Sequence, residues 1–501
     1  MRYIGSRGYT IYKKDLTESE REEIRRELTV KPKVSKMAVQ TAVSFPVYKE
    51  SVQKIYMPIY WGLARFPTSE IEFRIPFGED ICIPFVGNLR DYQLDIIAKY
   101  MNHIKKEKRG SFGGGLFDVI TGSGKTVMAL NVISQIKKKT LIIVHKTFLM
   151  NQWLERIEQF LPDARVGRIQ GECVDIDNKD IVIGMLQSLS MKEYHENTFK
   201  TFGLLVCDEV HHLSAEVFVR ALQCITTRYT LGLSASMQRK DGLSKVFKMF
   251  LGDVLHKDVR KNEHNVLVYA CHFCTNDPEF NEVKQDWRGN PLYSAMISRL
   301  CAYAPRSDYI LSLIENVFMT KPLSHLMVLA HNKSLLVYLY KAIEKKKDFP
   351  SVGYYLGGMK DKDLKTSETK QIILATYAMA SEGLDIKTLT TLIMATPKTD
   401  VTQSIGRILR TKDHQPIVYD IIDQHGLFQN QWRKRNTFYK KYDYCVQHNY
   451  SNNFNIALLN TTNEYHKIEC DKIKYDEINN SNTQCLIKLN KKCTDKKFGY
   501  S

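Results

Sequence analysis

The sequence lacks the features that would mark a membrane or secreted protein. No stretch approaches the run of about 18 apolar residues that a membrane-spanning helix needs. The first residues, MRYIGSRGYTIYKK, are charged and lack the apolar core of a secretory signal. The eleven cysteines are an odd number scattered over 501 residues, which favours reduced thiols over a disulfide framework. We therefore expect an intracellular protein with no membrane partner.

Acidic residues are outnumbered by basic ones. Lysine and arginine together number 72, against 55 aspartates and glutamates, and the net charge is +17 at pH 7. A surplus of this size favours a polyanionic partner, such as nucleic acid, a phosphate-rich ligand or an acidic membrane surface. The 43% apolar and 25% charged content is typical of globular proteins, and the length predicts roughly two to four domains.

Residues 1–85 are predicted to form a small accessory module. Thr17 and Glu20 have the spacing of a capping box, which predicts a charged helix over residues 17–28. Two later segments, 54–63 and 72–85, contain prolines that favour edge strands or loops.

Two α/β domains are predicted after this module. Short β-rich apolar runs alternate with helical periodicity, which is typical of a parallel sheet covered on both faces. The predicted organisation is a first domain over 86–275, a polar linker over 276–300, a second domain over 301–445 and a loosely ordered Asn- and Lys-rich tail over 446–501. The predicted strands are 115–120, 140–145, 180–186, 203–210 and 229–236, then 325–331, 370–377, 390–397 and 416–422.

A candidate phosphate loop, Thr121-Gly122-Ser123-Gly124-Lys125-Thr126, lies between a predicted strand and an amphipathic helix. Glycines let the backbone turn tightly, so that its N–H groups and the helix N-terminus can surround a phosphate. Lys125 would reach the β- and γ-phosphates of a nucleotide, and Thr126 would hold Mg²⁺. Val119 replaces the glycine that the strict pattern requires six residues before the lysine, and a glycine-rich turn with an incidental lysine is the alternative.

An acidic pair, Asp208-Glu209, ends another apolar run and is followed by His211 and His212. An acid at the carboxyl end of a parallel strand lies in the ligand crevice. Asp208 would position Mg²⁺, Glu209 would accept a proton from an attacking water, and His211 would sense the γ-phosphate. The alternative is a capping pair with surface histidines. Adjacent strand residues face opposite sides, which argues against a metal shared by the histidines.

Three residues of the second predicted domain complete the candidate site. Arg407 and Arg410 are three apart and share one side of a helix that begins near Gln403. An arginine supplied from another domain can neutralise charge on a transferred phosphoryl group, which makes hydrolysis depend on domain closure. The alternative is a solvated pair of arginines.

These segments, in this order, resemble superfamily 2 helicases over about residues 86–425. Further segments agree with the motifs of that family: Leu89–Gln93 with the adenine-reading motif, Val144–Lys146 with Gln152-Trp153, Gln187–Leu189, the coupling motif Ser234–Ser236, and Thr376 with Ala380–Asp385. The box Asp208–His211, and Gly232–Ser236 followed by Arg239–Gly242, are most similar to the XPB-like branch. That branch includes transcript-release helicases of poxviruses and related large DNA viruses, and the N-terminal segment and length are similar to those viral members.

The resemblance implies two tandem RecA-like P-loop NTPase domains that hydrolyse ATP with Mg²⁺ while moving on nucleic acid, on DNA in preference to RNA. It implies transcription machinery as a further partner and, for a viral protein, the host cytoplasm or the virion as the location. The implied residues are Gln93, Thr121, Gly122, Ser123, Gly124, Lys125, Thr126, Gly383 and Asp385 for ATP; Lys125, Asp208, Glu209, Gln403, Arg407 and Arg410 for catalysis; Thr126 and Asp208 for Mg²⁺; His211, Ser234 and Ser236 for coupling; and Lys146, Thr147, Gln187, Ser188 and Thr376 for nucleic acid.

Two other functions compete with this interpretation. A P-loop phosphotransferase would use the same loop without the second-domain arginines or stimulation by nucleic acid. A non-catalytic nucleic-acid-binding protein would be a decayed motor, against which the intact Lys125, Glu209 and Arg407 argue. The basic and aromatic segment 432–442 would stack bases or pack against its own domain. Cys271 and Cys274 form a lone C-x-x-C with no second pair at the distance of a zinc ribbon.

Overall fold

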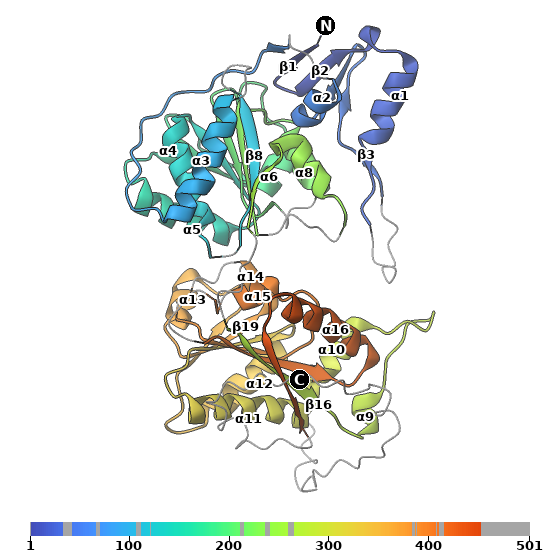
Figure 1. Ribbon diagram of the computed structural model, residues 1–501, viewed down its shortest axis with the longest axis vertical. Helices are drawn as coiled ribbons and strands as arrows, with labels where there is room; N and C mark the ends of the chain where they lie inside the picture. Colours follow the sequence, from blue (N-terminus) through green and yellow to red (C-terminus); the bar gives the residue numbers. More distant parts are fainter. Residues whose placement is uncertain are drawn as a thin grey trace. The chain divides into compact units, whose positions relative to one another are not determined.

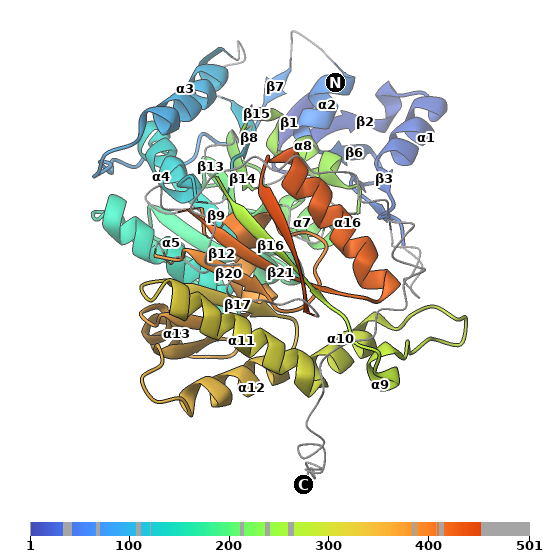
Figure 2. The ribbon, with the colours of Figure 1, turned by 60° about the horizontal axis from the view of Figure 1, so that its bottom comes forward.

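The computed structural model divides the chain into two compact units, Met1–Arg260 and Lys261–Ser501, and Figures 1 and 2 show their elements from two directions. It describes residues 2–33, 43–66, 71–106, 112–120, 122–210, 215–235, 241–258, 265–382, 386, 388–406, 408–409 and 415–451. Several predicted site residues lie outside these ranges, namely Thr121, His211, Ser236, Gly383, Asp385, Arg407 and Arg410.

The first unit begins with a small five-stranded sheet. In spatial order its strands are β5 (Lys49–Glu50), β6 (Lys54–Met57), β2 (Gly8–Tyr12), β1 (Arg2–Gly5) and β7 (Glu72–Phe73). One face, which carries Ile4, Ile11 and Ile55, is buried under α1 (Glu18–Glu27) and α2 (Ile59–Arg65). The short helix η1 (Lys13–Asp15) and the two-stranded sheet of β3 (Thr29–Val30) and β4 (Phe45–Pro46) complete the module.

The capping box at the start of α1 is confirmed. The Thr17 hydroxyl accepts a hydrogen bond from the Glu20 N–H, and the Glu20 carboxylate accepts one from the Thr17 N–H. The expectation of edge strands over 54–63 is wrong in part. The strand β6 lies inside the sheet, and α2 follows at once, because Pro58 has extended backbone at the N-cap of the helix and begins it.

The main sheet of the first unit has eight strands. In spatial order these are β11 (Cys173–Val174), β10 (Val166–Gln170), β12 (Ile181–Met185), β9 (Thr140–Val144), β13 (Leu204–Cys207), β14 (Tyr229–Ser234), β8 (Gly113–Asp118) and β15 (Val254–Lys257). All neighbours are parallel except β10 and β11. One face packs against α3 (Asp91–Lys106), α4 (Lys125–Ile136) and α5 (Thr147–Phe160), and the other against α6 (Leu186–Met191), α7 (Ala215–Leu222) and α8 (Ser244–Leu251).

The second unit contains a parallel sheet of seven strands. In spatial order these are β18 (Val352–Tyr355), β19 (Ile372–Thr376), β17 (Leu326–Ala330), β20 (Thr391–Met394), β21 (Ile417–Asp423), β16 (Leu267–Phe273) and β22 (Cys445–Tyr450). Helices α10 (Tyr293–Ala302), α11 (Ala304–Thr320) and α12 (Lys333–Glu344) cover one face. Helices α13 (Asp361–Glu368), α14 (Tyr377–Glu382), α15 (Thr402–Gly406) and α16 (Gly426–Lys441) cover the other, and α9 (Pro278–Asn281) precedes α10.

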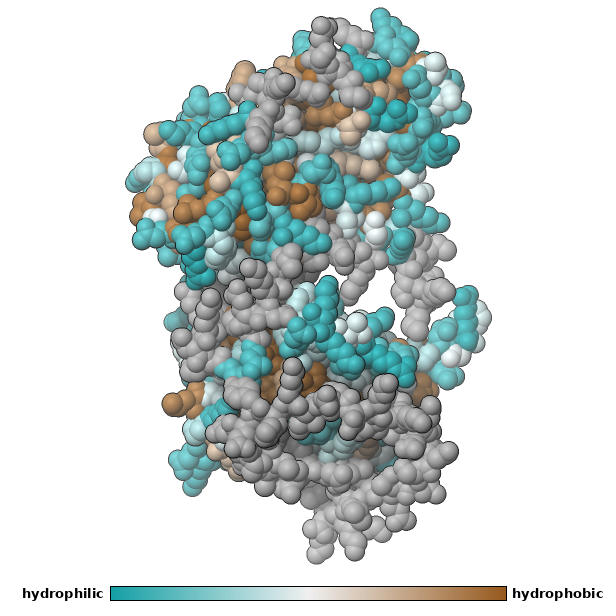
Figure 3. Space-filling view, in the orientation of Figure 1, coloured by the Kyte–Doolittle hydropathy of each residue, from teal (hydrophilic) through white to brown (hydrophobic). Residues whose placement is uncertain are grey.

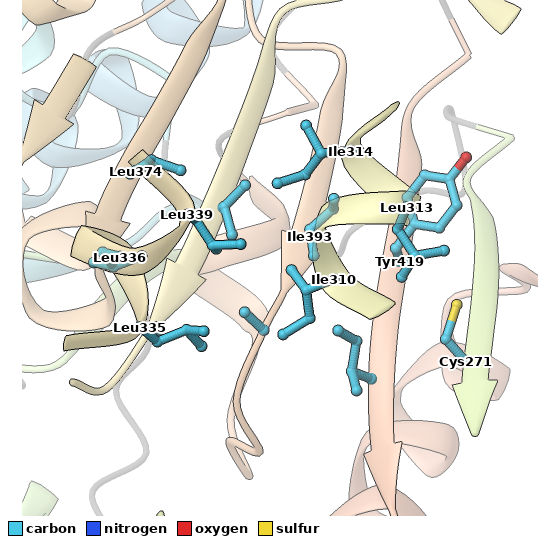
Figure 4. Close-up of a cluster of buried hydrophobic side chains, with 14 of the residues drawn as sticks. Cys271, Ile310, Leu313, Ile314, Leu335, Leu336, Leu339, Leu374, Ile393 and Tyr419 are labelled. Atoms are coloured by element: carbon cyan, nitrogen blue, oxygen red, sulfur yellow. The ribbon is translucent and has the colours of Figure 1, made fainter. Parts of the chain in front are cut away.

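The seven-stranded sheet has a hydrophobic core on each face, so that both faces are covered by helices. Figure 4 shows Leu313 and Ile314 of α11 and Leu335 of α12 directed at the strands. Alternate residues of β17 enter opposite cores, so that each strand buries side chains on both faces. Every run predicted as a strand in the two α/β domains forms one, and the expected fold class, α/β with two parallel sheets, is confirmed.

Two boundaries differ from the expectation. Strand β16 was expected in the first domain, but it pairs along its whole length with β21 of the second sheet. Its apolar run is equally suited to either sheet, because partner choice depends on a strand about 150 residues away. Strand β22 lies largely inside the expected tail, where a half-exposed edge strand has no apolar run to reveal it. The tail from residue 452 on lies outside the described residues.

The basic and aromatic segment packs against its own domain. Trp432 and Tyr439 of α16 are fully buried, and the Nε of Arg435 lies 2.7 Å from Oδ2 of Asp420. Within the described ranges, no three His, Cys, Asp or Glu side chains are grouped so that they could hold a metal ion. No helix in the described part of the chain has the length and apolar content to cross a membrane.

A buried histidine pair makes a pH-dependent contribution to the stability of the second unit. Nε2 of His272, on β16, lies 2.9 Å from Nδ1 of His448, on β22, and its ring stacks on Tyr450. Burial, and then the nearby His448, lower the pKa of His272 from 6.5 to about 4. The unfolded chain therefore binds this proton more readily, and stability present above pH 6.5 is lost as the pH falls toward 4.

We expect the free energy of unfolding to fall between pH 7 and pH 4.5 by about 2–3 kcal/mol more in the wild type than in His272→Gln. The glutamine amide keeps a polar partner for His448 but does not titrate. Urea unfolding of both proteins at pH 7 and pH 4.5 measures the difference. Equal pH dependence in the two proteins would contradict the assignment.

Candidate functional site

The predicted residues of the first unit gather at one edge of the eight-stranded sheet. Because the strands are parallel, their carboxyl ends share an edge. The phosphate loop follows β8, Asp208 follows β13, and Ser234 ends β14, while Lys146 follows β9 and Gln187 follows β12. The sheet thus brings together the groups expected to contact phosphate, metal and nucleic acid.

The loop after β8 has the backbone of an anion-binding turn. Gly122 and Gly124 have φ angles of 91° and 80°, in the left-handed region that favours glycine. Gly124 is the N-cap of α4, and Lys125 is its first residue. The first turn of α4 contains no acidic side chain, so the amides and the dipole of the helix N-terminus favour an anion there.

Gln93 connects α3 to this loop. Its side-chain Oε1 accepts a hydrogen bond from the Arg90 N–H at 2.9 Å, and its Nε2 donates to the carbonyl of Ser123 at 2.9 Å. The Tyr92 hydroxyl donates to the same carbonyl at 3.0 Å. A Cβ added to Gly124 would lie only 2.4 Å from the Gln93 amide nitrogen. The side chain predicted to read adenine therefore also fixes the loop that would hold the phosphates.

An ion pair joins the phosphate loop to the acidic strand end. The Lys125 ammonium lies 2.8 Å from Oε1 of Glu209, and their side chains are 9% and 20% exposed. Glu209 has φ +46°, a left-handed conformation that is rare outside glycine. This backbone turn follows Asp208 directly, so that the two carboxylates take different directions. Asp208 is fixed by the Trp153 Nε1–H, which donates to its Oδ2 at 2.8 Å, and by the Glu209 N–H at 2.9 Å.

Burial has a strong electrostatic effect on Asp208. Desolvation, and then the charge of Glu209, raise the pKa of Asp208 to about 6, while Lys125 and the hydrogen bond from Trp153 oppose this rise. Bringing a cation to the carboxylate would favour its charged form. The Asp208 carboxylate and the Thr126 hydroxyl, in the first turn of α4, are oxygen ligands of the kind that Mg²⁺ prefers.

A further support for the loop, which no sequence pattern indicates, comes from the end of β15. Asp258, just after β15, accepts a hydrogen bond from the Ile120 N–H at 3.1 Å and lies 2.7 Å from Nε2 of His256. Nδ1 of His256 lies 3.2 Å from the Lys99 ammonium of α3. Because an ammonium can only donate, the His256 proton sits on Nε2 and points at Asp258. This chain of contacts holds the residue that leads from β8 into the loop.

The residues predicted to contact nucleic acid lie on neighbouring loops. The Thr147 hydroxyl accepts a hydrogen bond from Gln170, and the Ser188 hydroxyl accepts one from the Gly171 N–H, at 3.1 Å and 2.9 Å. The tip of the β10–β11 hairpin therefore links the loops after β9 and β12. Lys146 and Gln187 are exposed beside them.

In the second unit, Thr376 ends β19 and is half-buried. Gln403 lies in α15, but its side chain, like Arg407 and Arg410, falls outside what the structure describes. Ser234 is fully buried at the end of β14, and its carbonyl accepts a hydrogen bond from the Val119 N–H at 2.9 Å. The predicted coupling residue Ser234 thus contacts the strand that leads to the phosphate loop.

Comparisons with known proteins find relatives of this chain. Residues 87–239 match the family described as type III restriction enzyme, res subunit. A protein of Acanthamoeba polyphaga mimivirus, named as an ATP-dependent RNA helicase, is 34% identical over 497 residues, which cover 96% of this chain and 93% of that protein. A protein of African swine fever virus with a similar name is 27% identical over 391 residues, which cover 73% and 75%. Among solved structures, S. cerevisiae Dbp5 bound to RNA and ADP BeF3 is 12% identical, with 71% and 89% coverage and a TM-score of 0.49.

The contact between Gly124 and Gln93 can be tested by adding one methyl group. We expect Gly124→Ala to displace the Gln93 amide and to distort the phosphate loop. If this distortion reduces the binding free energy of ATP by about 1.4 kcal/mol or more, the dissociation constant rises by roughly tenfold or more. Titration with a fluorescent ATP analogue measures the dissociation constant.

Gly289→Ala is the matched control. Gly289 also has φ +80°, but its nearest atom, Oε1 of Gln285, is 4.0 Å from an added Cβ. The control therefore carries the backbone strain without the clash, and its ATP affinity should equal that of the wild type. An unchanged affinity in Gly124→Ala would show that the contact does not position the loop.

Proposed function

Because the chain belongs to the superfamily 2 helicases that large DNA viruses encode, we propose that its phosphate loop and the acids after β13 carry out ATP hydrolysis. The protein is an ATP-dependent nucleic-acid helicase. The observation that supports this assignment of residues is the 2.8 Å ion pair between Lys125 and Glu209. The pair joins Lys125, the proposed phosphate-binding cation, to Glu209, the proposed general base, at one edge of the sheet.

The residues present fit Mg²⁺ as the cofactor. The Thr126 hydroxyl and the Asp208 carboxylate would hold the ion, and Trp153 would orient Asp208 from behind. When bound, Mg²⁺ neutralises charge on the phosphates. The raised pKa of Asp208 follows from its burial beside Glu209, and a cation at this position would favour the ionised form.

The ion pair also gives each partner its role. Lys125 exchanges the Glu209 carboxylate for phosphate oxygens when a nucleotide binds, because both anions compete for one buried ammonium. Glu209 is thereby released and accepts a proton from the attacking water. Gln403, Arg407 and Arg410 act on the transferred phosphoryl group from the second unit, and Gly383 and Asp385 contact the ribose, as in the family that the chain belongs to.

We further propose a single strand, held mainly through its phosphates, as the track. Lys146, Thr147, Gln187 and Ser188 would grip it from the first unit, and Thr376 from the second. His211, Ser234 and Ser236 would transmit the state of the nucleotide to these loops. DNA is proposed ahead of RNA, and viral transcription is the proposed process.

A P-loop phosphotransferase is the competing function. It would use Lys125 and Asp208 in the same way, but it would transfer the phosphoryl group to a small acceptor. Its rate would not respond to nucleic acid, whereas the rate of a motor that grips a strand would rise when the strand is added.

Glu209→Gln is expected to reduce ATP turnover at least about a hundredfold and to leave ATP affinity within a few-fold of the wild type. The amide keeps an acceptor for Lys125 but cannot take a proton. Steady-state ATPase and equilibrium binding measure the two effects. Normal turnover in the variant would refute the base assignment.

A second measurement separates the motor from the phosphotransferase. The ATPase rate of the wild type is compared without nucleic acid and with single-stranded DNA, duplex DNA or RNA at equal salt. A wild-type rate unchanged by every nucleic acid would favour the phosphotransferase.

Arg407→Ala is expected to lower kcat by roughly a thousandfold, with little change in ATP affinity, if Arg407 stabilises charge only in the transition state. The matched control is Arg433→Ala, which removes an exposed arginine of α16 that contacts Asn430. Its kcat should equal that of the wild type. Similar kcat values for Arg407→Ala and the control would remove Arg407 from the catalytic site.

A further inference from the structure

The five-stranded sheet of residues 1–85 has a second face that the proposed motor does not use. Strand register aligns one residue from each strand across it, in the order Lys49, Tyr56, Thr10, Tyr3 and Glu72. The neighbouring residues of each strand point to the opposite, buried face. The next position on β2 and β6 adds the pair Tyr12 and Lys54 to the same face.

Each tyrosine of this face lies beneath at least one cation. The guanidinium of Arg74 lies 4.1 Å from the ring centre of Tyr3. The Lys54 ammonium lies 4.7 Å from the ring centre of Tyr12 and donates a hydrogen bond to the Tyr3 hydroxyl at 3.1 Å. We call this surface the tyrosine face; its members are Tyr3, Tyr12 and Tyr56 with Arg7, Lys14, Lys54 and Arg74, and Arg7 and Lys14 lie 5.3 Å and 5.7 Å from the rings of Tyr56 and Tyr12.

The charge of the tyrosine face is predominantly positive. Arg7, Lys14 and Arg74 are exposed, and so is the adjoining Lys49. The acid aligned with the row is Glu72, which pairs with Arg74 at 2.6 Å. On the buried side of the sheet, Glu50 is paired instead with Lys13 and Arg25. On that opposite side of the sheet, hydrophilic side chains predominate over the outer surface of α1 in Figure 3.

Tyr3 and Thr10 are buried at the centre of the row, and the rings open to a ligand are those of Tyr12 and Tyr56, which are half-buried. Two such rings with exposed cations beside them suit a single strand of nucleic acid. Bases stack on aromatic side chains, and cations contact the phosphates between them. A flat sheet surface can bind unstacked bases, as in other sheet proteins that bind single strands, whereas a duplex hides its base faces. The ring contacts also restrain the lysine and arginine side chains, which reduces the entropy lost when they meet phosphates.

We propose that the tyrosine face binds single-stranded nucleic acid as a second contact, separate from the strand grip of the motor. The proposal rests on the proposed helicase function in one respect: the tyrosine face and the strand-gripping loops of the motor would bind the same nucleic acid. Because binding can be measured without ATP hydrolysis, its failure is distinguishable from a failure of the motor assignment.

The test compares the full-length wild type with Arg7→Gln/Lys14→Gln/Arg74→Gln, which removes three exposed cations. Fluorescence anisotropy measures the dissociation constant of labelled oligo(dT) and oligo(rU) without nucleotide over a series of salt concentrations. If three phosphate contacts are lost, the slope of log affinity against log salt should fall by about 2, since each contact to a single strand contributes about 0.7. Affinity should fall at least tenfold for one or both oligonucleotides, and kcat at saturating strand should not change.

The matched control, Arg26→Gln/Lys105→Gln/Lys200→Gln, removes three exposed cations of the first unit outside this face. It has the same net charge as the test variant, so its affinity and salt slope separate a local contact from general electrostatic attraction. Equal losses in the two variants, or no loss in the test variant, would overturn the proposal. So would a test variant that weakens duplex binding as much as single-strand binding.

A cross-linking measurement covers the case in which the triple variant unfolds. Wild-type protein is irradiated with an oligonucleotide that carries bromodeoxyuridine, and the linked peptides are identified by mass spectrometry. The expected cross-links include Tyr56 or Tyr12, which are only half-buried. Cross-links confined to residues 86–445 would overturn the proposal.

Discussion

The ion pair between Lys125 and Glu209 is the constraint on which the first unit depends. A nine-tenths buried ammonium without a nearby anion would be costly, so the loop after β8 and the strand end after β13 must stay together. They belong to strands separated by β14, whose carbonyl at Ser234 holds Val119 at the start of the loop. The order of the strands, the backbone of the loop and the direction of the Glu209 side chain together bring the ammonium and the carboxylate into contact.

Local backbone choices make the contact possible. Gly122 and Gly124 occupy left-handed conformations in the loop, and Glu209 occupies one without being glycine. Gln93 and Asp258 then hold the loop from α3 and β15 through hydrogen bonds to its backbone. These hydrogen bonds restrain the loop backbone, which would reduce the reorganisation that the proposed catalysis requires.

The sequence predicted what local patterns encode. Continuous apolar runs identified the parallel strands, and glycines with Lys125 located the loop, because both signals lie within a few neighbouring residues. It could not predict that β16 joins the second sheet, since that depends on pairing with the distant β21. Asp258 was missed for the same reason: an acid at the end of an edge strand has no local mark, and its partner Ile120 lies 138 residues away. The pairing of Lys125 with Glu209 was likewise beyond the motifs that located each residue.

The two units each contain a buried ion pair, and the two pairs differ in how far they are exposed to solvent. Arg306 and Asp423 share two hydrogen bonds at 2.6 Å and 2.8 Å and are fully buried, which fixes α11 to β21. Loss of either partner would strand a charge in the core at a cost of about 3–5 kcal/mol. The Lys125 ammonium lies 2.8 Å from the Glu209 carboxylate, and Glu209 remains 20% exposed. The proposed exchange of the Glu209 carboxylate for a phosphate requires this exposure, whereas the side chains of Arg306 and Asp423 are closed to solvent. A fully enclosed pair suits a structural role, and a partly exposed pair is compatible with the proposed chemistry.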